Sequence, residues 1–93
     1  MVVGMMRWDL SLPGVTSLKD KRAIVRSLKD RIHHRFRVSV AETDCQDQWT
    51  RAQLAVAMVA TDCGHAEDVL NKVDRLVAQE TRALVLERRR ELY

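Results

Sequence analysis

The chain has 93 residues, of which 46% are hydrophobic and 31% charged, a composition that suits one globular domain and excludes disorder. No apolar run approaches the roughly 20 residues of a transmembrane helix, and no basic leader precedes the apolar start, so we expect a cytoplasmic protein with a single domain over residues 1–93. Two cysteines, Cys45 and Cys63, are too few for a secreted disulfide framework, and a formal net charge of +3 is only a mild basic excess.

The first part of the chain predicts a strand followed by a helix. Apolar and polar residues alternate between Met6 and Leu12, which is the two-residue period of a strand with one buried face. A Pro-Gly pair then ends the strand. Ser17 is a suitable N-cap, and apolar residues at helical spacing predict a helix that extends to about Arg35.

The rest of the chain predicts two strands, a helix and a final strand. The expected limits are 36–40 for the second strand, 51–60 for the third, a helix capped by Thr61 or Asp62 and reaching Val77, and a fourth strand from 83 to 86 and beyond. The order is therefore βαββαβ. With right-handed crossovers, the compact arrangement at this length is a ferredoxin-like α+β fold, in which both helices cover one face of a four-stranded antiparallel sheet.

A two-layer fold of this kind leaves one sheet face uncovered. Alternation along the first and third strands places eight side chains there: Val3, Met5, Arg7, Asp9, Gln53, Ala55, Ala57 and Val59. Five of them are apolar, and these form the predicted interface: Val3, Met5, Ala55, Ala57 and Val59. One hypothesis for the function is therefore a homodimeric or protein-interaction module that buries this face.

The charge is concentrated on the predicted first helix. Residues 17–37 carry eight basic and two acidic side chains, a local balance of +6, whereas the remainder of the chain has a balance of −3. Five side chains occupy adjacent wheel positions from about 20° to about 100°, beside the apolar stripe and with no acid among them. We call them the basic ridge: Lys19, Arg22, Arg26, Lys29 and His33.

Such a ridge suits a phosphate backbone, because each neutralised phosphate releases condensed counterions and adds salt-dependent affinity. The alternative is a solvated helix face whose cations pair with acids of neighbouring elements. Lys21 lies at about −60°, within the apolar arc. It either snorkels past the edge of the core or reaches the acidic stretch 42–47 or a bound anion, and we include it at the margin of the predicted phosphate contacts.

Aromatic residues do not predict a base-stacking sheet. Trp8 and Phe36 have inward parity and are expected in the core. Trp49 either closes the end of the core or lies exposed near the acidic stretch. Any nucleic acid would then be bound through phosphates and shape.

The remaining candidate groups predict neither catalysis nor a bound metal or cofactor. The chain has no nucleophile elbow, no paired-carboxylate motif and no glycine-rich phosphate loop. The spacing of Cys45, Cys63 and His65 matches no standard zinc pattern. The alternating acids of the stretch 42–47 are interpreted as a solvated loop, with a weak divalent-ion site as the alternative. We expect no enzyme activity, no cofactor, no small-molecule substrate and no membrane contact.

Four motifs carry a resemblance to a known family. They are Leu-Pro-Gly at 12–14, Ser-Leu-Lys-Asp-Lys-Arg at 17–22, Phe-Arg-Val-Ser-Val-Ala-Glu at 36–42 and Asp-Cys-Gln-Asp-Gln-Trp at 44–49. In these motifs the chain resembles, from end to end, the YlxP-like family of small bacterial proteins. The resemblance implies a ferredoxin-like fold and attaches no catalytic role to any residue. Genes of the family tend to lie among those for transcription termination, translation initiation and ribosome maturation, which implies a non-enzymatic role near RNA or a ribosomal subunit.

Overall fold

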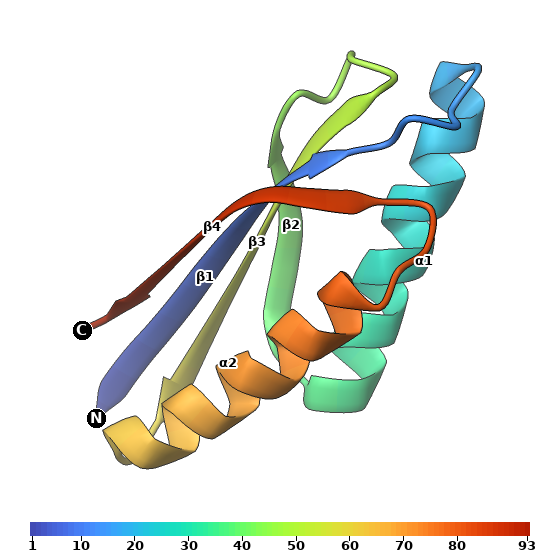
Figure 1. Ribbon diagram of the computed structural model, residues 1–93. Helices are drawn as coiled ribbons and strands as arrows, with labels where there is room; N and C mark the ends of the chain where they lie inside the picture. Colours follow the sequence, from blue (N-terminus) through green and yellow to red (C-terminus); the bar gives the residue numbers. More distant parts are fainter.

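Two helices cover one face of a four-stranded antiparallel sheet in the computed structural model, which describes residues 1–93 (Figure 1). The elements are β1 (Val2–Ser11), α1 (Leu18–Phe36), β2 (Ser39–Asp44), β3 (Arg51–Ala60), α2 (Cys63–Ala78) and β4 (Leu84–Leu92). The strands lie in the order β2-β3-β1-β4, and each neighbouring pair is antiparallel. The predicted βαββαβ ferredoxin-like fold is confirmed. Neither helix combines the length and apolarity that would let it cross a membrane.

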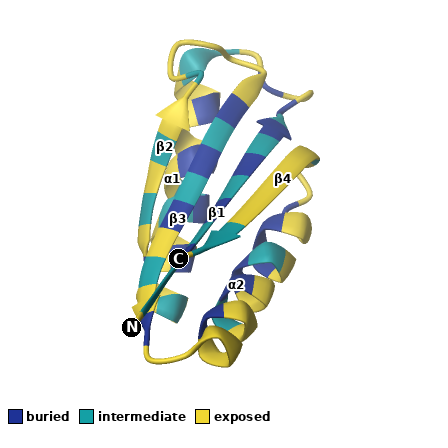
Figure 2. Cartoon of the chain, turned by 90° about the vertical axis from the view of Figure 1, so that its left-hand side faces the viewer, coloured by how far each residue is buried: buried dark blue, intermediate teal, exposed yellow.

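The core forms between the helices and the inner face of β1 and β3. Along both central strands, more buried residues alternate with half-buried or exposed ones, as the bands in Figure 2 show. Trp8 on β1 is paired with Leu54 on β3, and both side chains are fully buried. The indole Nε1 of Trp8 donates a hydrogen bond of 2.8 Å to Asp74 Oδ1 on α2, so its one polar atom is satisfied. The predicted core position of Trp8 is confirmed.

Gly4 allows α2 to pack closely against β1. A Cβ at this position would lie 3.2 Å from a methyl carbon of Leu70 and 3.5 Å from the Cβ of Ala66, both on α2. A larger side chain would therefore push the helix away from the sheet.

Side-chain caps begin both helices. Ser17 accepts a hydrogen bond of 3.1 Å from the backbone N–H of Asp20, as its position before the apolar stripe predicts. Asp62, rather than Thr61, caps α2 and accepts a bond of 2.8 Å from the N–H of His65.

The predicted boundary between α1 and β2 is wrong by about three residues. Phe36 is the last residue of α1 and not the start of a strand, and it packs half-buried against the core. Arg37 then adopts a left-handed conformation with φ 54°, and its N–H bonds the carbonyl of His33 at 2.9 Å. β2 consequently begins at Ser39 and includes Asp44, so it takes up residues that were predicted to form the connection to β3.

Candidate functional site

The basic ridge lies along the exposed side of α1, next to the buried stripe that holds the helix on the sheet. Its side chains are exposed except for Lys29, which is half-buried. None of the four permanent cations takes part in a salt bridge or a side-chain hydrogen bond, since the salt bridges of the protein involve other residues. The ridge spans fifteen helical positions, a length of about 21 Å. It is therefore a continuous row of cations with no acidic partners.

His33 ends the ridge and is partly committed to the backbone. Its Nδ1 lies 3.1 Å from the carbonyl oxygen of Val38, which makes Nδ1 the protonated donor in the neutral tautomer. The Nε2 atom forms no hydrogen bond within the protein, so His33 can present it to a ligand.

Lys21 is not available to a phosphate, and its inclusion among the predicted phosphate contacts is wrong. Its side chain is fully buried, which also excludes snorkelling. The ammonium lies 3.0 Å from Glu42 Oε2 and donates hydrogen bonds to the carbonyl of Gln46, at 3.2 Å, and to that of Cys45. Lys21 thus reaches the stretch 42–47, which was the second expectation for it.

The Lys21 contact has a structural role because it joins the first turn of α1 to the turn between β2 and β3. Glu42 Oε2 is buried and has no aligned hydrogen-bond donor, so the ion pair with Lys21 is its main compensation. The ammonium of Lys21 donates to two backbone carbonyls of this turn, which would otherwise have no hydrogen-bond donor.

A second group of cations lies between α1 and α2. We call it the interhelical cluster: Arg35, Lys72 and Arg75. These residues line a cleft of about 270 Å³ near the end of α1. Lys72 pairs with Asp68 at 3.1 Å, whereas Arg35 and Arg75 have no acidic partner. The sequence alone does not predict this cluster, because its members come from two helices and meet only when those helices pack.

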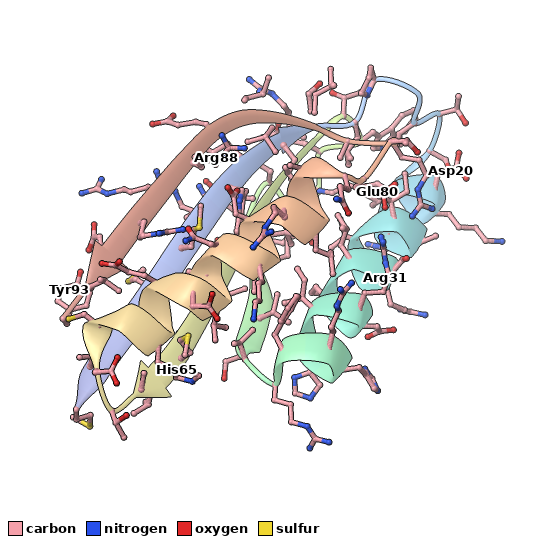
Figure 3. The ribbon with its side chains drawn as sticks, turned by 60° about the horizontal axis from the view of Figure 1, so that its bottom comes forward. Asp20, Arg31, His65, Glu80, Arg88 and Tyr93 are labelled. Atoms are coloured by element: carbon pink, nitrogen blue, oxygen red, sulfur yellow. The ribbon has the colours of Figure 1, made fainter.

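A third group of charges forms ion pairs that link α1 to the segment after α2. Arg31 Nη2 lies 2.5 Å from Glu80 Oε2, and both residues are labelled in Figure 3. Arg82 holds the other oxygen of Glu80 at 2.7 Å. The hydrogen bond from Arg82 and, secondarily, that from Arg31 lower the pKa of the buried Glu80 carboxyl to about 2. Arg31 therefore already has an acidic partner, Glu80.

The predicted interface lies on the face of the sheet opposite the helices. Val59 is 66% exposed and Ala57 is exposed, while Val3, Met5 and Ala55 are half-buried. Further exposed apolar residues lie on or after β4: Leu84, Leu86 and Tyr93. Charged residues cross the β1 and β4 half of this face, including an Arg89–Glu91 pair with a 2.8 Å contact. The apolar surface is therefore concentrated on β3 and at the ends of β1 and β4.

The stretch 42–47 is held by contacts within the protein. Glu42 pairs with Lys21, and Asp44 Oδ1 accepts a 2.8 Å hydrogen bond from the N–H of Cys45. No three histidine, cysteine or acidic side chains lie close enough together to hold a metal ion. Trp49 follows this stretch and is 52% exposed, so it does not close the core.

Comparison with known proteins places the chain in a family. Residues 3–90 match the family described as "Protein of unknown function (DUF503)". The chain is 29% identical over 72 residues to the uncharacterized protein YlxP of Bacillus subtilis (strain 168), an alignment that covers 77% of this chain and 78% of YlxP. The YlxP-like resemblance is confirmed.

Two solved structures show the same fold at low sequence identity. The de novo designed ferredoxin-fold protein LFR1 1 has a TM-score of 0.56 at 12% identity, and the match covers 99% of this chain and 85% of the design. LarC2, the C-terminal domain of a cyclometallase involved in the synthesis of the NPN cofactor of lactate racemase, has a TM-score of 0.56 at 14% identity. That match covers all of this chain and 55% of LarC2. With its sequence matched from residue 3 to residue 90, the chain belongs to the DUF503 family.

Proposed function

We propose that this protein is a non-enzymatic, cytoplasmic RNA- or ribosome-associated protein that binds phosphate backbone through the basic ridge. The observation that carries the proposal is the row of four permanent cations without acidic partners: Lys19, Arg22, Arg26 and Lys29. A cation that is already paired must break that contact before it binds a phosphate. The ridge cations bind without this cost, and each contact releases counterions from the nucleic acid.

The number of free cations sets the expected salt dependence. Four phosphate contacts predict that the logarithm of the binding constant falls with the logarithm of salt concentration with a slope of about −3 to −4. The affinity should accordingly fall roughly 60- to 250-fold between 50 and 200 mM salt. Such binding is insensitive to base sequence, because phosphates carry no sequence information.

The interhelical cluster supports the same function. Arg35 and Arg75 are free of acidic partners and lie on the opposite side of the C-terminal half of α1 from the ridge. Together with the ridge they place free cations on both flanks of the helix. A phosphate chain that follows the ridge can therefore make further contacts across the end of α1.

Filter binding to ribosomal RNA across a salt series tests this proposal. The test variant is Lys19→Gln/Arg22→Gln/Arg26→Gln, for which we expect weaker binding at low salt and a slope reduced by about 3. A matched variant, Arg7→Gln/Arg51→Gln/Arg89→Gln, removes the same charge from the opposite face of the sheet. It should retain a slope close to that of the wild type. Binding curves that are indistinguishable for the two triple variants would overturn the proposal.

A homodimeric or protein-interaction module that uses the predicted interface is the second candidate function. It is favoured by the exposure of Val59 and Ala57 on the uncovered sheet face, towards the end of β3. Sedimentation equilibrium of the wild type and of Ala57→Glu distinguishes this candidate, with Arg75→Glu on the helical face as the control. We expect a dimer that Ala57→Glu dissociates and Arg75→Glu does not. A wild-type monomer at millimolar concentration, with no protein partner in a pull-down, contradicts it.

A further inference from the structure

β3 extends beyond β2 at one end of the sheet and leaves an open position there. Ser39, the first residue of β2, pairs with Ala57, so residues 58–60 have β1 on one side and no strand on the other. A cavity of about 480 Å³ lies at this position, bounded by the end of α1, the first half of α2 and the end of β3. We call it the edge slot.

The backbone of Val59 presents an unpaired donor and acceptor to the edge slot. Val3, its partner on β1, exchanges both of its backbone hydrogen bonds with Tyr93, at 2.9 and 2.8 Å, on the far side of β1. Because hydrogen-bonded and non-hydrogen-bonded pairs alternate in an antiparallel ladder, the N–H and C=O of Val59 point away from β1. No loop or turn supplies a backbone partner for them. They can therefore pair with an added strand.

The side chains around the edge slot define what such a strand would carry. Phe36, Met58 and Val69 form an apolar wall on the helix side. The ionisable side chains that line the cavity are Arg37 and His65, and neither forms a salt bridge. His65 is labelled in Figure 3 on the first turn of α2. With the guanidinium of Arg37 and no acid, the lining is complementary to an apolar ligand that carries a negative charge.

The position of Arg37 indicates in which direction an added strand with a negative charge would run. Arg37 precedes Ser39 by two residues and lies at the end of the slot nearest β2. A peptide that runs in the direction of β2 is antiparallel to β3, like every other neighbour in this sheet. Such a peptide ends beside Arg37 and brings its C-terminal carboxylate to the guanidinium.

We propose that the edge slot binds the C-terminal end of an extended peptide by strand addition. One peptide residue pairs with the backbone of Val59. An adjacent apolar side chain then points to the helix side, between Phe36 and Val69, because side chains alternate across a strand. The terminal carboxylate is held by Arg37. This site uses neither the basic ridge nor RNA and so goes beyond the function proposed above.

A titration of the ¹⁵N-labelled 93-residue chain followed by ¹H–¹⁵N NMR tests the proposal. The probe is the peptide acetyl-TVSVTL with a free C-terminal carboxylate, and the control is the same peptide with a C-terminal amide. We expect saturable shifts centred on Ser39, Val59 and Val69, with at least tenfold weaker binding of the amide. Shifts that do not saturate by millimolar peptide, or equal affinity for the two peptides, would overturn the proposal.

Two variants test the individual contacts. Val59→Pro removes the donor and should weaken binding at least tenfold, whereas Val59→Ala keeps the backbone groups and should stay within about twofold of the wild type. Arg37→Gln alters an exposed side chain and should weaken binding of the carboxylate peptide but not of its amide. The spectrum of each variant reports whether it is folded. Wild-type affinity in a folded Val59→Pro, or no change for the carboxylate peptide in Arg37→Gln, contradicts the assigned contacts.

Discussion

Replacement of Lys21 by methionine tests whether the buried ion pair stabilises the fold. The change keeps an unbranched side chain that is shorter only by the ammonium nitrogen, and it leaves the carboxylate of Glu42, which is only 16% exposed, without its cation. It also removes the donor to the carbonyls of Cys45 and Gln46. Breaking a buried pair costs about 3 to 5 kcal/mol, and the residual exposure of Glu42 favours the lower end. We therefore expect Lys21→Met to lower the free energy of unfolding by about 3 kcal/mol.

Urea denaturation followed by far-ultraviolet circular dichroism at pH 7 measures this loss. Lys19→Met is the matched control, because Lys19 is exposed and unpaired, and it should change the free energy of unfolding by less than about 0.5 kcal/mol. Adding Glu42→Gln to Lys21→Met neutralises the stranded carboxylate and should restore about 1 to 2 kcal/mol. A loss in Lys21→Met no larger than that in Lys19→Met would refute the structural role of the pair. A double variant without recovery would refute the stranded charge as the cause.

Three further predictions concern a depressed pKa, a buried indole and the two tryptophans. The pKa of Glu80 is lowered from 4.5 to about 2 by its hydrogen bonds from Arg82, so its ionised form stabilises the folded state above pH 4.5 and this contribution is lost as pH falls towards 2. Because the arginine partners are half-exposed, we expect Glu80→Gln to lower the free energy of unfolding by about 2 kcal/mol at pH 7, measured by thermal or urea unfolding. The difference in stability between Glu80→Gln and the wild type should disappear as the pH falls from 4.5 to 2. A difference that does not change with pH contradicts this prediction. Asp74→Ala leaves the indole N–H of Trp8 without its acceptor and should cost about 2 kcal/mol in the same assay, whereas a loss below about 0.5 kcal/mol would show that the bond is unimportant. Trp49→Phe should leave the blue-shifted, acrylamide-protected fluorescence of the buried Trp8, and Trp8→Phe should leave red-shifted, quenchable emission; reversed spectra would contradict the two burial assignments.

The helix start and the central strands follow from local patterns. The Ser17 cap and the alternation from Met6 to Leu12 depend on residues close in sequence, whose hydrogen bonds and burial repeat with a known period. The end of α1 does not follow in this way. The alternation that begins at Phe36 predicts a strand, but packing of its ring against the core extends the helix to that residue, and the left-handed Arg37 then turns the chain.

The sequence by itself determined the element order, the uncovered sheet face and the basic ridge. The ridge belongs to one helix, in which a rotation of about 100° per residue relates Lys19 to Lys29 whatever packs beneath them. Only the tertiary structure decided that Lys21 is buried against Glu42, that Arg35 and Arg75 share a cleft, and that β2 stops short of Val59. The physical reason is common to all three features. Each depends on groups that are far apart along the chain and meet only after the helices and strands have packed.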